Sequence, residues 1–256
     1  MKLAIVGPGL IGRSVALAAK RAAPDTEIVE IDREDAIAAA AVADLIVLAA
    51  PVDAILDILL HHADLLRPVV TLDTGSTKTE IVASARRLGL DRFVGGHPMA
   101  GAATSGPAAA RADLFDGRAW FLVTRGADAS AVEQATSFVR MLGARPVTMG
   151  DGGEEHDRAI AAVSHLPQVV ASVLMGVVGD AAGDRLSWAG GGLRDTTRLA
   201  ASSVAMWESV LKTNASELRP LLLDVAARLT QIAHELGDAE EVRRLFAKAN
   251  HYRALL

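Results

Sequence analysis

The sequence has no cysteine, a single tyrosine and no run of lysine or arginine. Without cysteine the chain can form neither disulfide bonds nor cysteine-ligated metal sites, and it has no thiol nucleophile. This composition fits a reducing compartment, so we expect a cytoplasmic protein and assign no metal ligands. The net charge of −5 and the lack of a basic run argue against nucleic acid or an anionic membrane as a partner.

Charge is also missing from residues 159–179, a segment of 21 residues that has about the length needed to span a bilayer. The segment contains polar residues that are costly in hydrocarbon, among them His165 and Gln168. We therefore expect no membrane span here, but a helix buried on most sides by its own subunit or also by a partner. The N-terminus starts like a signal peptide, but glycines interrupt its apolar run after Val6, which predicts a strand and a turn.

A glycine-rich turn follows this first strand. Residues 2–6 are apolar, GPGLIG supplies Gly7, Gly9 and Gly12, and a good helix-forming segment comes next. The order of strand, glycine turn and helix is typical of dinucleotide-binding units. Gly7 would permit the tight turn, Gly9 would let a pyrophosphate approach the backbone, and Gly12 would let the helix pack against the strand.

An acidic residue stands where such a unit places its ribose-binding acid. The second apolar run ends at Asp32, twenty residues after Gly12. A carboxylate there would bind the ribose hydroxyls and repel a 2′-phosphate, which favours NAD, although Arg33 beside it keeps NADP possible. The predicted cofactor-binding residues are Gly7, Gly9, Leu10, Ile11, Gly12 and Asp32.

Strand and helix patterns alternate as far as residue 149 and then stop. Further strands are expected at 44–51, at 68–73, before Gly95, at 118–123 and at 144–149, with helices between them. This alternation predicts an α/β fold whose N-terminal domain, residues 1–150, has a Rossmann-like, mostly parallel sheet. After Asp151 no segment has a strand pattern, so residues 151–256 should form an all-helical domain, joined through a hinge at 150–153.

The segment GGHPMAG places His97 on a glycine-flanked loop after a short apolar run. Pro98 disfavours helix at His97, and an imidazole with an ordinary pKa of about 6.5 can accept a proton at neutral pH. His97 is therefore the leading candidate for a general base. The alternative is a Gly-Pro turn that happens to contain a histidine. Ser76, which follows another strand, could bond substrate or cofactor, or cap the helix that begins near Lys78.

The helical half contains two further histidines and a pair of arginines. His156 falls in an acidic first helical turn, where a surface position is the simplest interpretation. His165 lies among apolar residues near Pro167 and could be a satisfied core histidine or a site residue. Arg194 and Arg198 are four residues apart, hence on one helix face, and could either clamp carboxylates or form a solvated face with Asp195. Met206 and Trp207 are expected in the core.

Taken together, these motifs resemble the prephenate and arogenate dehydrogenase family of tyrosine biosynthesis. The similarity extends over almost the whole chain in the order GPGLIG with Asp32, DTGSTK, GGHPMAG, HDRAIAAVSHLP and GGLRDTTRLAASSVAMW. It implies a Rossmann domain, a helical domain that forms a homodimer, and an active site between them. The implied substrate is prephenate or arogenate, with hydride transfer to NAD.

The resemblance also implies roles for individual residues. His97 matches the family's catalytic histidine, and Ser76 matches the serine that bonds the same substrate hydroxyl. His165 matches a substrate-binding histidine, Arg198 matches the arginine that holds a substrate carboxylate, and Arg194 falls where relatives carry lysine or arginine. His156 matches a histidine near the pocket.

One departure from the family concerns Ala102 and Ala103, where some relatives carry a glutamate, and it leaves the choice between prephenate and arogenate open. A dehydrogenase of 4-amino-4-deoxyprephenate is a further possibility within the family. Outside it, another NAD(P)-linked hydroxy-acid or imino-acid dehydrogenase would often use a lysine of the helical half, here Lys212 or Lys248. A non-enzymatic NAD(H) sensor would need neither a base nor an arginine pair.

Overall fold

The structure, a computed structural model, describes residues 1–32, 37–101 and 106–255. Arg33 and the pair Ala102 and Ala103, which bear on the cofactor and substrate predictions, lie outside the described residues.

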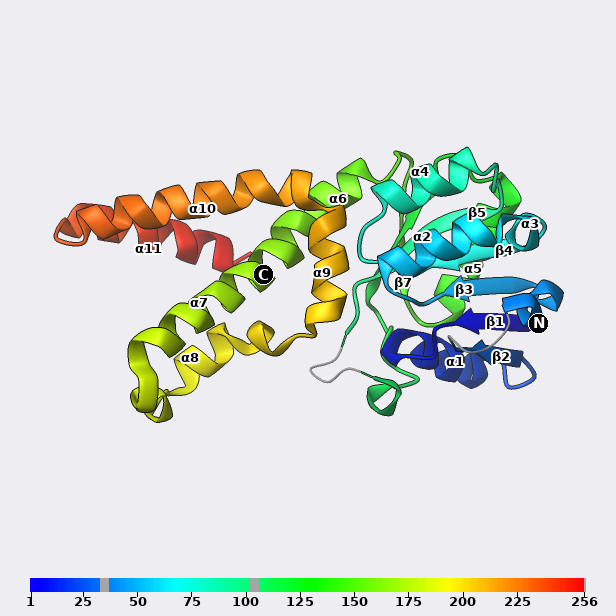
Figure 1. The fold of residues 1–256 in the computed structure, drawn as a ribbon, viewed down its shortest axis with the longest axis horizontal. Coiled ribbons are helices and arrows are strands. Elements are labelled where there is room, and N and C mark those ends of the chain that lie inside the picture. Colours follow the sequence, from blue (N-terminus) through cyan, green and yellow to red (C-terminus); the bar gives the residue numbers. More distant parts are fainter. Residues whose placement is uncertain (33–36, 102–105, 256) are drawn as a thin grey trace.

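The N-terminal half is built on a seven-stranded sheet, to the right in Figure 1. Its strand order is β2-β1-β3-β4-β5-β6-β7, with parallel pairing except between β5 and β6. The predicted α/β fold with a mostly parallel sheet is confirmed. The strands are β1 Lys2–Val6, β2 Glu27–Ile31, β3 Leu45–Leu48, β4 Val70–Asp73, β5 Phe93–Pro98, β6 Ala119–Val123 and β7 Arg145–Met149.

Helices cover both faces of this sheet, and the strands supply apolar residues to both. In β1, Leu3 and Ile5 belong to one buried cluster while Ala4 and Val6 belong to the other, because successive side chains of a strand point to opposite faces. The first cluster includes α1 and α5, and the second includes α2 and α4. These helices are α1 Leu10–Ala22, α2 Val52–His61, α3 Ala63–Leu66, α4 Thr79–Arg87 and α5 Ala129–Met141, with short 3₁₀ segments at Ile37–Val42 and Pro107–Ala109.

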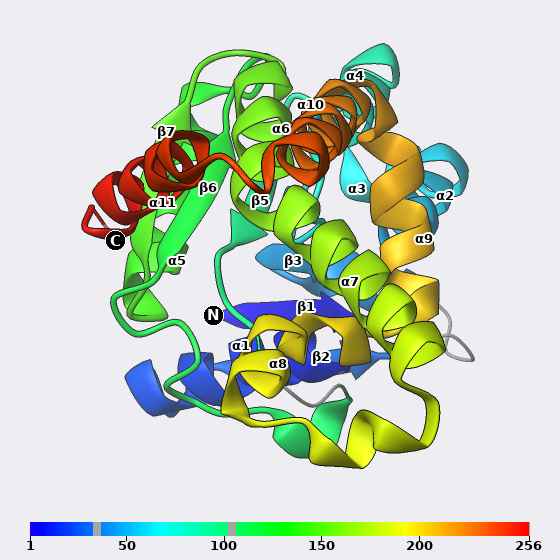
Figure 2. The same ribbon diagram turned by 90° about the vertical axis from the view of Figure 1, so that its left-hand side faces the viewer.

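The described residues after β7 form helices and no strand, as predicted. Figures 1 and 2 show α6 and α9 next to the carboxyl ends of the strands, while α7 and the hairpin of α10 and α11 extend away from the sheet. The helices are α6 Glu154–Ile160, a π-helical turn Ala161–His165, α7 Leu166–Ala182, a 3₁₀ segment Gly183–Trp188, α8 Gly191–Thr196, a 3₁₀ segment Arg198–Ala201, α9 Val204–Thr213, α10 Ala215–Glu235 and α11 Ala239–Arg253.

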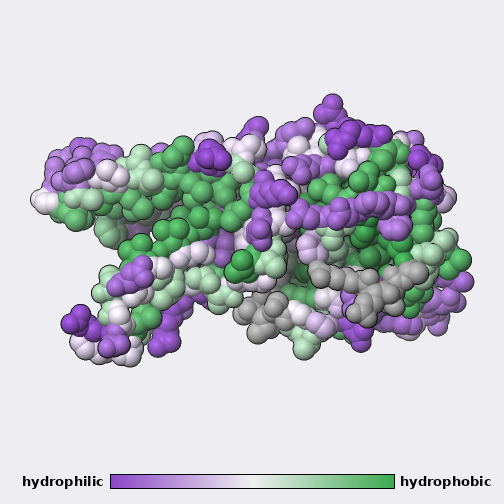
Figure 3. All heavy atoms as spheres, in the orientation of Figure 1, coloured by the Kyte–Doolittle hydropathy of each residue, from purple (hydrophilic) through white to green (hydrophobic). Residues whose placement is uncertain are grey.

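Helix α7 is only partly buried by its own chain, and burial by a partner stays a prediction. Only Gln168 and Ala171 of α7 are buried, whereas Val173 and Val177 are about 60% exposed. The helical stretch Glu154–Trp188 is long and apolar enough to cross a membrane by length and composition alone. Figure 3 shows apolar side chains gathered over α7 and α10. The expectation of a core position fails for Met206, which is 46% exposed.

Candidate active site

The predicted cofactor turn lies at the point where the strand order of the sheet reverses. From β1 the chain goes to β2 on one side and then crosses to β3 on the other. In sheets of this type, ligands bind outside the carboxyl ends of the strands at this switch point. The turn that follows β1 therefore lies where a dinucleotide is expected, and the loops after β3, β4 and β5 adjoin it along the same edge.

The geometry of this turn fits a dinucleotide. Gly7 has φ = +96°, and a Cβ there would lie 2.4 Å from the carbonyl oxygen of Ala49, so only glycine is compatible. A Cβ at Gly12 would lie 2.2 Å from the Gly7 carbonyl oxygen, because α1 passes close to the turn. At Gly9, in contrast, a Cβ would meet no described atom within 4 Å, which leaves room for a phosphate at the start of α1.

The other predicted cofactor residues adjoin this turn and β2. Leu10 and Ile11 form the first residues of α1 and are partly buried against the sheet core. Asp32 directly follows β2 and is exposed. Asp32 thus lies at the carboxyl end of β2, beside the glycine turn, which is where a dinucleotide-binding unit has its ribose-binding acid.

His97 lies at the carboxyl end of β5, which continues through Pro98, so the expected loop is part of the strand. The residue pairs with Phe121 of β6 and is buried. Burial, together with nearby His156, Lys78 and His165, holds the pKa of His97 well below its ordinary value of 6.5. The imidazole is therefore neutral at pH 7, which is the state that a general base requires.

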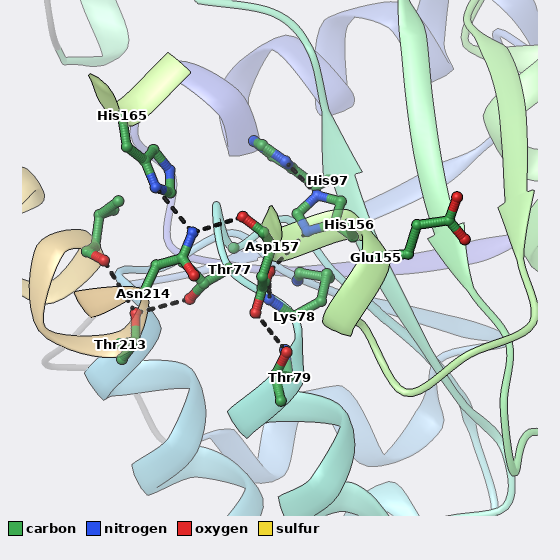
Figure 4. Close-up of polar contacts among 12 residues, drawn as sticks. Thr77, Lys78, Thr79, His97, Glu155, His156, Asp157, His165, Thr213 and Asn214 are labelled. Atoms are coloured by element: carbon green, nitrogen blue, oxygen red, sulfur yellow. Dashed lines mark hydrogen bonds and ion pairs between the residues drawn. The ribbon is translucent and has the colours of Figure 1, made fainter. Parts of the chain in front are cut away.

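His156 is fully buried beside His97, so its expected surface position is wrong. Its Nε2 lies 2.9 Å from His97 Nδ1, and its Nδ1 lies 2.8 Å from Asp157 Oδ1. Figure 4 shows the three side chains in a row, with Asp157 and His156 on α6 and His97 on β5. The acidic first turn of α6 indicated solvent, but the helix places these two residues against the strand ends.

The Asp157 carboxylate joins the two halves of the molecule. Oδ1 accepts a hydrogen bond from the backbone N–H of Lys78 at 2.7 Å, and Oδ2 accepts one from the N–H of Thr79 at 2.9 Å. Burial raises the pKa of Asp157, but hydrogen bonds from His156, Thr79 and Lys78 outweigh it, and the pKa is lower than the ordinary 3.8. The Asp157 carboxylate thus accepts the backbone N–H groups at the start of α4, and the alternative that Ser76 caps this helix is not what the structure shows.

Ser76 and a buried ion pair occupy the loop between β4 and α4. Ser76 is half-buried. Lys78 is fully buried and pairs with Asp73, whose Oδ1 also accepts the N–H of Gly96 at 2.8 Å. Burial lowers the pKa of Lys78, although the Asp73 carboxylate opposes this effect. The pair fixes the loop after β4 against β5, directly beside His97.

His165 enters the site from the helical half, at the end of the π-helical turn. Its Nδ1 lies 3.1 Å from Asn214 Nδ2, and the Trp207 ring lies edge-on to it with centroids 5.6 Å apart. Its Nε2 is buried and has no hydrogen-bond partner among the described residues. Burial lowers the pKa of His165 to about 4, so this imidazole is also neutral at pH 7.

The two arginines do not share one helix face, which corrects the spacing argument. Helix α8 ends at Thr196, and Arg198 begins a separate 3₁₀ segment. Between the two arginines, Thr196 and Thr197 donate their side-chain hydroxyls to carbonyls one turn back. Both arginines are exposed. The segment of Arg198 is tied to α7 by a 2.8 Å hydrogen bond from Gln168 Nε2 to the Leu199 carbonyl.

Several site residues were missed by the sequence interpretation. Asp157, Asn214, Lys78 and Asp73 hold the histidines or the loops around them. The adjacent pair His156 and Asp157 was a usable signal, because two polar residues in an apolar-rich segment need buried partners or solvent. Nothing local marks Asn214, which reaches the site only through tertiary packing.

A glycine turn at the switch point of a Rossmann-type sheet, with a buried neutral histidine at a nearby strand end, defines a dinucleotide-dependent dehydrogenase with a helical second unit. Comparisons with known proteins agree. The family model described as "Prephenate dehydrogenase, nucleotide-binding domain" matches residues 8–148, and "Prephenate dehydrogenase, dimerization domain" matches residues 152–248. The chain therefore belongs to the prephenate dehydrogenase family.

Individual relatives cover nearly the whole chain. It is 35% identical to prephenate dehydrogenase of Bacillus subtilis, over 97% of this chain and 74% of that protein. The crystal structure of Synechocystis arogenate dehydrogenase is 28% identical and covers 99% of each chain with a TM-score of 0.81. A. aeolicus prephenate dehydrogenase in complex with hydroxyphenyl propionate and NAD+ has the same fold, with a TM-score of 0.87 at 24% identity, over 100% of this chain and 98% of that chain.

Proposed function

We propose that the chain is an NAD-dependent prephenate dehydrogenase, which oxidises and decarboxylates prephenate to 4-hydroxyphenylpyruvate. The observation that carries this proposal is a pair of buried, neutral imidazoles, His97 at the end of β5 and His165 from the helices, at the edge of the sheet that also carries the cofactor turn. A reaction that removes a proton and a hydride from one carbinol needs such a base next to a nicotinamide.

The chemistry of the substrate sets what the residues have to do. Prephenate is a cyclohexadienol with a hydroxyl at C4, a carboxylate on C1 and a second carboxylate on its side chain. Loss of the hydroxyl proton and of hydride from C4 creates a dienone, and C1 then loses carbon dioxide as the ring becomes aromatic. Aromatisation drives the reaction, so the protein has to orient the carbinol, accept its proton and hold the carboxylates.

We assign these tasks to the predicted site residues. His97 accepts the hydroxyl proton, and Ser76 bonds the same hydroxyl. His165 binds the substrate from the helical side, while Arg198 and Arg194 bind carboxylates. The proposed division into domains is 1–150 and 151–256, with the substrate between them.

The cofactor is assigned to Gly7, Gly9, Leu10, Ile11, Gly12 and Asp32. NAD+ supplies the hydride acceptor when bound. The choice of NAD is supported by Asp32, whose carboxylate would repel a 2′-phosphate, and by the NAD+ in the A. aeolicus enzyme.

We further propose a cytoplasmic homodimer formed through the helical half. Support comes from the match of residues 152–248 to a dimerization domain and from the exposed apolar side chains of that half. These include Val173 and Val177 on α7, Leu223 and Leu229 on α10, and Phe246 on α11. A second copy that covers them accounts for the apolar α7 without a bilayer.

Arogenate is the second candidate substrate, and the 28% identity to Synechocystis arogenate dehydrogenase supports it. Arogenate has the same dienol ring and the same two carboxylates, so the proposed base and arginines serve either compound. A lysine-dependent hydroxy-acid dehydrogenase is less well supported, because Lys212 and Lys248 are both exposed.

The test is an NADH-forming assay with prephenate, arogenate and 4-amino-4-deoxyprephenate, each with NAD+ and with NADP+. We expect the highest kcat/KM with prephenate and NAD+, and one carbon dioxide released for each NADH formed. Higher kcat/KM with arogenate would overturn the substrate assignment but not the class of reaction. No reduction of either cofactor with any of the three compounds would overturn the proposed function.

A further inference from the structure

Asp157 is hydrogen-bonded to His156, which contacts His97, and to Asn214, which contacts His165. Its carboxylate lies 2.8 Å from His156 Nδ1, and its backbone carbonyl accepts a 2.8 Å hydrogen bond from Asn214 Nδ2. Both groups are acceptors only. They therefore determine where the hydrogens lie in two hydrogen-bonded chains. One runs from the carboxylate through His156 to His97, and we call it the carboxylate branch. The other runs from the backbone carbonyl through Asn214 to His165, and we call it the carbonyl branch.

The carboxylate branch leads to His97. Because Asp157 Oδ1 can only accept, His156 Nδ1 carries the hydrogen of that bond, and in a ring with one hydrogen the other nitrogen, Nε2, is an acceptor. His97 Nδ1, 2.9 Å from this Nε2, must then donate. The proton of neutral His97 is thus on Nδ1, and its Nε2 carries the free lone pair.

The carbonyl branch leads to His165 with the opposite result. Asn214 must turn its amide nitrogen toward the Asp157 carbonyl, and the same nitrogen lies 3.1 Å from His165 Nδ1. Since the amide nitrogen is a donor, His165 Nδ1 is the acceptor. The proton of neutral His165 is therefore on Nε2, the buried atom that has no partner among the described residues.

We propose that Asp157 is the positioning residue that fixes both tautomers, so that His97 presents a proton acceptor at Nε2 and His165 presents a proton donor at Nε2. Asp157 does so through His156 on one side and through Asn214 on the other. The chemical use of this pattern rests on the proposed function: the acceptor takes the carbinol proton, and the donor bonds a substrate oxygen. The tautomers themselves do not depend on any substrate.

The direct test is nitrogen NMR of the full-length protein labelled with ¹⁵N-histidine, at neutral pH and without ligand. Two-bond proton–nitrogen correlations distinguish a protonated ring nitrogen from an unprotonated one. The His97→Asn and His165→Asn proteins assign the two spin systems by loss of their signals. We expect His97 protonated at Nδ1 and His165 protonated at Nε2; either proton on the other nitrogen would overturn the proposal.

Two variants of His156 separate positioning from packing. His156→Gln can place an amide oxygen near the position of Nε2 and keep an acceptor for His97, whereas His156→Phe fills the space with no acceptor. With the substrate that the enzyme turns over, we expect His156→Phe to lower kcat at least about tenfold with KM changed less than about threefold. The loss of kcat should be the same at every pH where the kcat of the unsubstituted enzyme does not change with pH. His156→Gln should have a kcat much closer to that of the unsubstituted enzyme. His61→Phe, the same change at an exposed histidine, is the matched control.

Equal losses in His156→Gln and His156→Phe would overturn the relay to His97, as would an unchanged kcat in His156→Phe. Because His156 is buried, thermal unfolding of each variant is recorded, and the NMR result on the unsubstituted protein decides the matter if a variant does not fold. If none of the candidate substrates is oxidised but both tautomers are as expected, the proposed function fails while the inference about Asp157 stands.

Discussion

Acid should destabilise this protein through His165 by an amount that can be calculated. The pKa of His165 is about 4 in the folded chain, against about 6.5 for an unperturbed histidine. Between these values the unfolded chain binds a proton that the folded chain does not, so the free energy of unfolding falls as the pH falls. Relative to pH 7, this one group should remove about 2 kcal/mol at pH 5 and about 3 kcal/mol at pH 4.

The His165→Asn variant isolates this effect. An asparagine oxygen can occupy the position of Nδ1 and accept from Asn214, so the polar contact is kept while the titrating group is lost. The other carboxylates and histidines titrate in both proteins, and their contributions cancel in the difference. We expect the unsubstituted protein to lose stability relative to the variant as the pH falls below about 6.5, with most of the change complete near pH 4.

Urea unfolding at fixed protein concentration, at pH 7, 5 and 4, measures this difference. Protein concentration is held constant because a dimer adds a concentration-dependent term. If the gap between the two proteins at pH 4 equals the gap at pH 7 to within about 0.5 kcal/mol, His165 titrates normally in the folded state. The assignment of a neutral donor at this position would then be wrong.

Three further predictions concern the base, the clamp and the cofactor. His97→Asn should lower kcat by about 100-fold or more with cofactor affinity unchanged, measured by steady-state kinetics and NADH titration. In the unsubstituted enzyme, the pH at which kcat/KM drops to half on the acid side should lie well below 6.5, because burial lowers the pKa of His97. A midpoint at pH 6.5 or above would contradict the buried base. Arg198→Ala should chiefly raise KM, by roughly tenfold or more, and normal saturation by substrate would refute the carboxylate contact. Gly12→Ala should abolish NAD binding measured by calorimetry, because the added Cβ would lie 2.2 Å from the Gly7 carbonyl oxygen; NAD binding of unchanged affinity would show that the turn does not hold the cofactor.

The sheet and the cofactor turn could be predicted from the sequence because their signals are local. Alternating apolar segments mark buried strands, and the spacing of Gly7, Gly9 and Gly12 reflects contacts within one turn. His97 was a good candidate for a related reason: the proline after it and the glycines around it indicate an extended strand end.

The errors arose where distant segments or another chain decide the outcome. His156 was placed on the surface because its helical turn is acidic, although its ring packs against His97 of β5 and Phe121 of β6. Spacing by four predicted that Arg194 and Arg198 share one helix face, but α8 ends at Thr196 and Arg198 belongs to a separate 3₁₀ segment. Burial of α7 could not be assessed from one chain, since a second copy is the partner that we propose for its apolar face.

The bonds between the sheet and the helices have a consequence for molecular motion. Asp157 and His156 belong to one side, while the amides of Lys78 and Thr79 and the ring of His97 belong to the other. Any movement that parts the two sides removes the acceptor from His97 and uncaps α4 at the same moment. The hydrogen-bonded row from Asp157 to His97 is therefore complete only while the sheet and the helices are in contact, so the position of the helical side and the tautomer of the proposed base are coupled.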